Sequence, residues 1–463
     1  MRISVVIVVR NRAGYLAESL QSILDQSYPA HEIVLVDVLG DEEYIKGSIS
    51  QIDHPRIKCV FRDEDKAYSS AIGEGCHAST GEIICFLDGS DKFKREKLGE
   101  VAKYFGDHPH ENIISHSCFV VSRDGKILSL WRPKAKISLE DLLLQEPMPL
   151  SAIAIRRSSV HELISNPESA VVDAGWMSFV VHLLLPNIPL NVIDRPLSDC
   201  RAVSNPGEIT QSDYLQHSIR ILEMIFDHPD CPESLLRLRE SALARIHLKL
   251  AYEAFVRGDT AIGREMLRSS IYLDRSILDV QAYRFFFFLI VESVKEEDHQ
   301  NRIARVFGQL PAEMIWMLPH MNEVIARGFV LHGIRAILWG RVEEGKLDLA
   351  EALRLGCRID QYFYYALAEE LLGCETVYGP GDVDLALHSL TPYLEKMSTP
   401  SLVRWFKGEF FANRSFREFN KGRYSLALRS IQYAILTRPE FMANRGLLVT
   451  LFRSLGRLRS RRA

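Results

Sequence analysis

The sequence of 463 residues contains no paired-cysteine motif and no long apolar run. Its eight cysteines are scattered without a CxxC pair, which argues against a disulfide framework or a zinc site and favours thiols in a reducing compartment. The most apolar later run, residues 285–291, is too short to span a bilayer. Residues 1–9 lack the layout of a signal peptide. These absences predict a cytoplasmic protein, at most peripheral to a membrane, with no transmembrane segment.

Basic side chains are not in excess either. Lysine and arginine number 56 against 60 aspartates and glutamates, which gives a net charge of −4. Because nucleic acids call for a basic domain or stripe, no nucleic-acid partner is expected. Hydrophobic residues make up 47% of the chain, so a sizeable core is available. The length indicates two or three domains.

Glycine-rich phosphate motifs are also missing, although the first part of the chain alternates as nucleotide-binding folds do. Apolar runs at 3–9, 32–38, 57–61 and 83–87 are separated by amphipathic helical stretches. This alternation predicts a doubly wound, mainly parallel sheet. No GxGxxG follows the first run, and no GxxxxGK[ST] occurs. A bound phosphate must therefore be held in another way.

The stretch 80–91 is central to the first domain. Its apolar run ends abruptly at Asp88, Ser90 and Asp91. The carboxyl ends of strands in open α/β sheets are where ligands bind, and carboxylate oxygens suit a hard divalent cation that neutralises a diphosphate. The alternative is that Asp91 caps an ordinary surface helix beginning near Lys92.

Four motifs in order resemble a known enzyme family. They are residues 8–12 (VVRNR), 22–29 (SILDQSYP), 33–38 (IVLVDV) and 79–91 (STGEIICFLDGSD). Together they resemble the inverting, GT-A-type glycosyltransferases of family 2. The resemblance covers residues 3–200 and implies sugar transfer from a nucleoside-diphosphate-sugar donor to a saccharide or other acceptor.

The resemblance also implies the site residues. Donor and nucleotide contacts fall on Val9, Asn11, Asp37, Asp88 and Ser90, with Asp37 at the nucleotide base. Mn²⁺ or Mg²⁺ would be held by Asp88 and Asp91.

The sequence departs from the family at several of these positions. The residue after Asp37 is Val38 where a second aspartate is usual, an expected aromatic is Arg10, and an asparagine before the acidic motif corresponds to Gly73. Ser90 stands where a carboxylate commonly binds the metal, and a hydroxyl is a weaker ligand for a hard cation.

The general base of an inverting transfer takes the proton of the attacking hydroxyl. The family places it after a strand ending in two arginines, which corresponds here to residues 151–157. Asp173 is the only carboxylate in the window 171–179, so it is the candidate base, with a plain surface aspartate as the alternative. Trp176 either packs against a sugar ring or belongs to the core. Arg201 is placed to reach a phosphate.

The composition turns polar between residues 198 and 211, and residues 204–207 mark a linker, after which the pattern is helical. We therefore expect a GT-A domain over residues 1–203 and an all-α helical-repeat domain over 204–463. Glycine turns followed by a small residue five positions later are typical of tetratricopeptide-like units. This layout occurs at the glycine turns Gly258, Gly345, Gly381 and Gly422.

The function expected from these features is glycosyl transfer in bacterial envelope polysaccharide or glycoconjugate synthesis, with a glycan or lipid-linked acceptor. The helical region would bind a protein partner or mediate self-association, or would only buttress the catalytic domain. The alternative function is a degenerate glycosyltransferase-like scaffold that binds through its helical repeats. Val38, Ser90 and the weak match of the segment around Asp173 favour this alternative.

Overall fold

The computed structural model describes the following residues: 1–9, 13–38, 42–50, 52, 54–60, 68–144, 148–164, 190–202, 219, 222–223, 225–227, 231–279, 284–295 and 298–460. The chain forms two compact units, residues 1–316 and 317–463, each of which is described by itself. Asn11, Asp173 and the expected domain boundary at 203/204 lie outside the described residues. That boundary stays a prediction.

The first unit is built on one mixed sheet. Its strands are β1 (Ile3–Val9), β2 (Glu32–Asp37), β3 (Ile57–Val60), β4 (Ile83–Asp88), β5 (Lys92–Phe93), β6 (Ile113–Val121), β7 (Ile127–Trp131), β8 (Lys136–Ile137), β9 (Ile153–Arg156) and β10 (Leu190–Arg201). Their order is β3-β2-β1-β4-β9-β6-β10-β5, with β7 beside β6 and β8 beside β10. β1 is parallel to β2 and to β4, whereas β9 runs antiparallel to both its neighbours. The predicted mainly parallel α/β sheet is confirmed.

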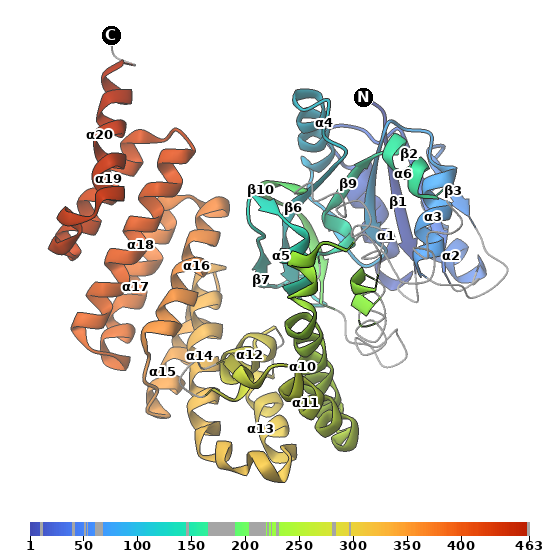
Figure 1. The fold of residues 1–463 in the computed structure, drawn as a ribbon. Coiled ribbons are helices and arrows are strands. Elements are labelled where there is room, and N and C mark those ends of the chain that lie inside the picture. The colour runs from blue at the N-terminus through green and yellow to red at the C-terminus, as the bar shows by residue number, and fades with distance from the viewer. Residues whose placement is uncertain are drawn as a thin grey trace. The chain divides into compact units, whose positions relative to one another are not determined.

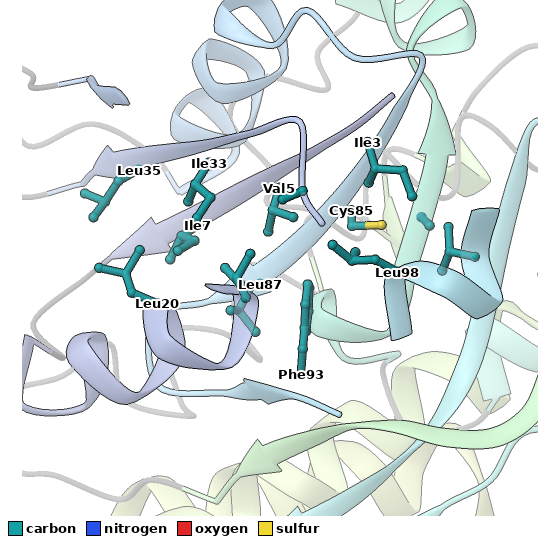
Figure 2. Packing of buried hydrophobic residues seen from close by; sticks show 14 of the residues in the cluster. Ile3, Val5, Ile7, Leu20, Ile33, Leu35, Cys85, Leu87, Phe93 and Leu98 are labelled. Carbon is teal, nitrogen blue, oxygen red and sulfur yellow. The ribbon is translucent and has the colours of Figure 1, made fainter. Parts of the chain in front are cut away.

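Helices cover both faces of this sheet (Figure 1). Those packed around it are α1 (Ala13–Leu24), α2 (Glu42–Ile49), α3 (Tyr68–Ala78), α4 (Lys97–Asp107), α5 (Leu139–Leu144) and α6 (Arg157–Ile164), with a short 3₁₀ turn η1 (Leu150–Ala152) before β9. Alternate residues of each strand point to opposite faces. Val5 and Ile7 therefore join the core with α1 and α4, while Val6 and Val8 join the core with α3. Figure 2 shows the first of these cores, with Leu20, Phe93 and Leu98 against the strands.

The predicted strands up to residue 88 are found within a few residues of the expected apolar runs, and a helix lies in each interval between them. The interpretation of Asp91 as a helix cap is wrong. Lys92–Phe93 form strand β5, which pairs antiparallel with β10, and the next helix begins only at Lys97.

All elements in the described residues after 202 are helical. In the first unit they are α9 (Glu233–Leu236), α10 (Arg239–Arg257), α11 (Thr260–Leu273), η3 (Arg275–Leu278), α12 (Arg284–Ser293) and α13 (His299–Gln309). After η4 (Ala312–His320), the second unit holds α14 (Met321–Leu338), α15 (Val342–Arg354), α16 (Gln361–Tyr378), α17 (Pro380–Met397), α18 (Pro400–Asn420), α19 (Tyr424–Thr437), η5 (Pro439–Ala443) and α20 (Arg445–Ser460), arranged in a row (Figure 1). Within the described ranges, no helix combines the length and the apolar character needed to cross a bilayer.

Three helical hairpins share one turn geometry. Gly258, Gly340 and Gly422 have φ of +94°, +85° and +72°, a region that favours glycine. In each hairpin, the amide of the next residue donates to the carbonyl five positions earlier, at 2.8, 2.7 and 2.9 Å. The sequence identified two of these glycines correctly. Gly345 was the wrong choice for the third, because it lies inside α15 as the small residue five positions after the turn glycine, Gly340.

The remaining predicted turn is also displaced. Gly379, with φ of +90°, separates α16 from α17, and Gly381 lies inside α17. The tetratricopeptide-like nature of these hairpins stays a prediction.

A pair of glycines lets α14 and α15 approach closely. A Cβ on Gly333 would lie 2.8 Å from the Gly345 carbonyl oxygen, and a Cβ on Gly345 would lie 2.4 Å from the Gly333 carbonyl oxygen. Since both obstacles are backbone atoms, a side chain at either position would force the helices apart.

We therefore expect Gly345→Ala to lower the free energy of unfolding by about 2 kcal/mol, because overpacking outweighs the better helix propensity of alanine. The matched control is Gly381→Ala, where a Cβ would meet no atom within 4 Å. Urea unfolding of the full chain measures both. Equal midpoints for the two variants would contradict the close approach.

At the amino-end edge of the sheet, Glu32 joins three segments. Its carboxylate accepts hydrogen bonds from Ser4 Oγ at 2.7 Å, from Thr80 N at 2.5 Å and Oγ1 at 2.8 Å, and from Lys58 Nζ at 2.5 Å. Burial alone would raise the pKa of Glu32, but these hydrogen bonds lower the pKa to about 2.

A depressed carboxylate pKa stabilises the fold above the unfolded value of about 4.5, and this contribution is lost as the pH falls toward 2. Glu32→Gln should lower the free energy of unfolding by about 2 kcal/mol at neutral pH. Its stability should converge with that of the wild type between about pH 4.5 and 2. Thermal unfolding against pH tests this, with exposed Glu43→Gln as the control. A constant difference over that range would contradict the assignment.

Candidate functional site

Three predicted site residues lie at adjoining strand ends. Val9 pairs with Asp37 across β1 and β2, and Val8 pairs with Asp88 across β1 and β4. Parallel strands end at the same edge of a sheet, so Val9, Asp37 and Asp88 share the carboxyl edge of β2-β1-β4. Val9 and Asp37 are both 2% exposed, whereas Asp88 is partly exposed.

The turn after β4 is closed by the Asp88 side chain. Asp88 Oδ1 accepts hydrogen bonds from Ser90 N at 3.0 Å and from Ser90 Oγ at 2.7 Å. Gly89 fits against the end of β1, where its amide donates to the Val8 carbonyl at 2.9 Å. Ser90 is fully buried, so its hydroxyl orients Asp88 and does not face solvent.

Asp91 is held from the sheet side. Its Oδ2 accepts a 2.6 Å hydrogen bond from Ser151 Oγ, and its Oδ1 accepts a 2.8 Å hydrogen bond from the amide of Arg201. Ser151 Oγ also accepts from the Asp88 amide at 3.0 Å. The carboxylate is 6% exposed and links the acidic turn to η1 and β10.

The side chain of Arg201 braces the same turn. Its Nη1 donates to the Ser90 carbonyl at 2.8 Å, its Nη2 lies 3.2 Å from Glu18 Oε2, and the guanidinium stacks 4.0 Å from the centre of the Tyr15 ring. Burial alone would raise the pKa of Glu18, but Arg201 and Lys92 lower it. Arg201, expected to reach a phosphate, instead lies behind the turn with its side chain 3% exposed.

Behind Ser151 lies a buried ammonium group. Lys97 is fully buried, donates to the Ser151 carbonyl at 2.6 Å, lies 3.3 Å from Ser198 Oγ and sits 3.5 Å above the Phe93 ring. Burial lowers the pKa of Lys97 to about 8. The Lys97 ammonium also interacts electrostatically with the Asp91 carboxylate.

The structure thus unites the predicted residues Val9, Asp37, Asp88, Ser90 and Asp91 in one region, whereas Asn11 and Asp173 lie outside the described residues. Sequence reasoning missed Ser151 and Lys97 as partners of the turn. Neither has a local signal, since their contacts depend on chain segments that come together only in the folded sheet.

The residues present could hold a divalent cation if Asp88 bound it together with the phosphates of a substrate. In the described residues, no group of three or more histidine, cysteine or acidic side chains is placed to hold a metal. Both Asp91 oxygens accept hydrogen bonds that metal binding would have to displace. Asp88 is the partly exposed carboxylate, and one or two carboxylates with substrate phosphates are a usual magnesium environment.

Part of the chain matches a known family. Residues 4–161 match the model of Glycosyl transferase family 2. These residues form a family 2 glycosyltransferase domain. It contains the β2-β1-β4 edge, the acidic turn and Ser151.

Similar proteins carry glycosyltransferase names. An uncharacterized glycosyltransferase of Nostoc sp. (strain PCC 7120), alr2836, is 30% identical over 35% of this chain and 53% of its own length. TuaG of Bacillus subtilis (strain 168), provisionally assigned to teichuronic acid biosynthesis, is 31% identical over 21% of this chain and 38% of its own. The chain therefore spans about half the length of the first relative and less than half the length of the second.

Solved structures of S. aureus TarS are similar in part. The 1–349 fragment in complex with UDP-GlcNAc matches with a TM-score of 0.38 and 14% identity, over 78% of this chain and 93% of that one.

The hydrogen bonds predict different roles for the two aspartates. Asp91→Asn should lower the free energy of unfolding by about 2 kcal/mol, because in either amide orientation the NH₂ group faces a donor, Ser151 Oγ or the Arg201 amide. Asp88→Asn should cost about 1 kcal/mol or less, because the remaining carbonyl oxygen still accepts from Ser90. Urea unfolding measures both, with exposed Asp107→Asn as the control. A larger loss for Asp88→Asn would reverse the assignment.

Proposed function

We propose that this protein is an inverting glycosyltransferase that uses a nucleoside-diphosphate-sugar donor. The observation that carries the proposal is the meeting of Val9, Asp37 and Asp88 at one sheet edge inside the family 2 domain. In open α/β sheets the carboxyl edge of adjoining parallel strands is where nucleotides bind.

The donor would lie along this edge with its base toward Asp37 and its diphosphate toward Asp88. A buried carboxylate at the end of β2 can accept hydrogen bonds from a base N–H. Val9 would supply backbone contacts, and Asn11 polar ones. Ser90 would act by fixing the Asp88 rotamer through its 2.7 Å hydrogen bond.

In the transfer step, the acceptor oxygen forms a bond to the anomeric carbon as the bond between that carbon and the phosphate oxygen breaks. The diphosphate leaves with the electron pair, and a general base takes the acceptor proton. Asp173 is the proposed base. Mn²⁺ or Mg²⁺, held by Asp88 with Asp91 as the second proposed ligand, would neutralise the leaving diphosphate.

The acceptor is proposed to be a glycan or lipid-linked saccharide of the bacterial envelope, at the cytoplasmic side of the membrane. The assignment of TuaG to teichuronic acid biosynthesis supports this class. The helical hairpins are proposed as tetratricopeptide-like units that bind a protein partner or a second copy.

Calorimetry of the full chain with UDP, GDP and dTDP, with and without Mn²⁺, tests the donor site. We expect one nucleotide to bind, and Asp37→Asn to weaken it about tenfold through loss of a charge-assisted hydrogen bond. Asp88→Asn should reduce the gain in affinity that Mn²⁺ provides. Asp107→Asn is the control. If no nucleotide binds to the wild type, the proposal fails.

The second candidate is a binding protein on a degenerate glycosyltransferase fold. It is favoured by the burial of Ser90 in a position where the family commonly has a metal-binding carboxylate. The two candidate functions are separated by measuring the release of nucleoside diphosphate from a panel of nucleotide sugars, in the presence of acceptors extracted from an envelope fraction. A protein that binds nucleotide but releases no nucleoside diphosphate with any of these acceptors would favour the scaffold.

A further inference from the structure

Helix α20 of the second unit has one packed face and one exposed face. Leu447, Thr450 and Ser454 are buried at 0%, 6% and 0% exposure. Leu447 belongs to a small core with residues of α18, α19 and η5. This spacing of three and four residues fixes which side of the helix packs.

The opposite side is apolar as well. Val449, Phe452 and Leu455 are 48%, 67% and 41% exposed, and they recur every three residues, so they lie on the same side of the helix. Met442, in the preceding η5, is 65% exposed. A phenylalanine with two-thirds of its surface in water, flanked by aliphatic side chains, is a surface that gains free energy when it is covered.

Positive charge surrounds these side chains. Residues 441–463 contain six arginines and no aspartate or glutamate. Three of these arginines, Arg445, Arg453 and Arg457, are exposed on α20. The nearest preceding carboxylate, Glu440, is engaged by Arg438 at 3.0 Å. Residues 441–463 themselves therefore contribute positive but no negative side chains to this surface.

The combination of exposed apolar side chains and arginines on α20 limits which partner can cover this face. A second copy of the same face would bring arginines against arginines. A nucleic acid would neutralise the arginines but leave Val449, Phe452 and Leu455 uncovered. A bilayer with anionic headgroups accepts both features, since apolar side chains enter the acyl boundary while arginines stay among the phosphates.

We propose that the exposed face of α20, formed by Val449, Phe452 and Leu455 with Arg445, Arg453 and Arg457, docks on an anionic lipid surface. The helix lies in the plane of the interface. Docking of α20 on lipid would be independent of the proposed glycosyl transfer.

Sedimentation of the full chain with vesicles tests the docking. We compare phosphatidylcholine vesicles with vesicles that also contain about 30 mol% phosphatidylglycerol, which supplies the negative surface. Wild-type protein should bind the anionic vesicles at least tenfold more strongly, and raising the salt concentration should weaken the binding.

Variants separate the apolar and the electrostatic contributions. Val449→Ala with Phe452→Ala should weaken binding roughly tenfold, and Arg453→Gln with Arg457→Gln by a similar factor. The matched control is Leu347→Ala, which removes a 74% exposed leucine from α15. Unchanged urea midpoints show that each variant is folded.

Several results would overturn the proposal. They are no binding to anionic vesicles, equal binding to neutral ones, and equal losses for Leu347→Ala. Self-association of the wild type that Phe452→Ala abolishes would identify the face as a contact between copies. Tight binding to soluble poly-glutamate that the Val449→Ala and Phe452→Ala substitutions leave unchanged would identify the face as a binding site for polyanions only.

Discussion

The buried carboxylate of Asp91 imposes the constraint on which the site depends. An ionised carboxylate inside a protein is costly unless donors reach it. Here the donors are the Ser151 hydroxyl and the Arg201 amide, from segments 60 and 110 positions later in the chain. Satisfying Asp91 therefore requires η1 and β10 to lie against the turn after β4. The geometry of the site is a consequence of this requirement.

Asp88 and Asp91 carry the same charge but have different surroundings. Asp91 is enclosed by hydrogen-bond donors from the sheet, and the buried Lys97 lies behind Ser151. Asp88 is partly exposed, and Ser90 fixes one of its oxygens. A ligand at the sheet edge would meet Asp88 without displacing the hydrogen bonds that Asp91 accepts. Environment, and not residue type, distinguishes the two aspartates: Asp91 is buried among donors that hold the turn, whereas Asp88 is the more accessible carboxylate.

Much of the fold was predictable because its signals are local. Buried parallel strands are continuous apolar runs, so β1, β2 and β4 could be located directly, and the acidic residues after β4 marked the edge. Ser151, Lys97 and Arg201 could not be assigned as partners of the turn, because their contacts span 54 to 111 positions. Likewise, Gly340 and Gly345 are both plausible turn glycines from sequence, since only the fold shows which one has a positive φ and which one allows close helix packing.

Charge illustrates the difference between an average and a local property. The net charge of −4 describes the chain as a whole, yet six arginines without a carboxylate occupy residues 441–463. Exposed charges farther apart than about 8–10 Å are largely screened at physiological salt. A surface that approaches α20 therefore responds to the local arginines and not to acidic residues elsewhere in the chain. Because Phe452 is exposed beside them, electrostatic attraction and apolar burial act at the same place.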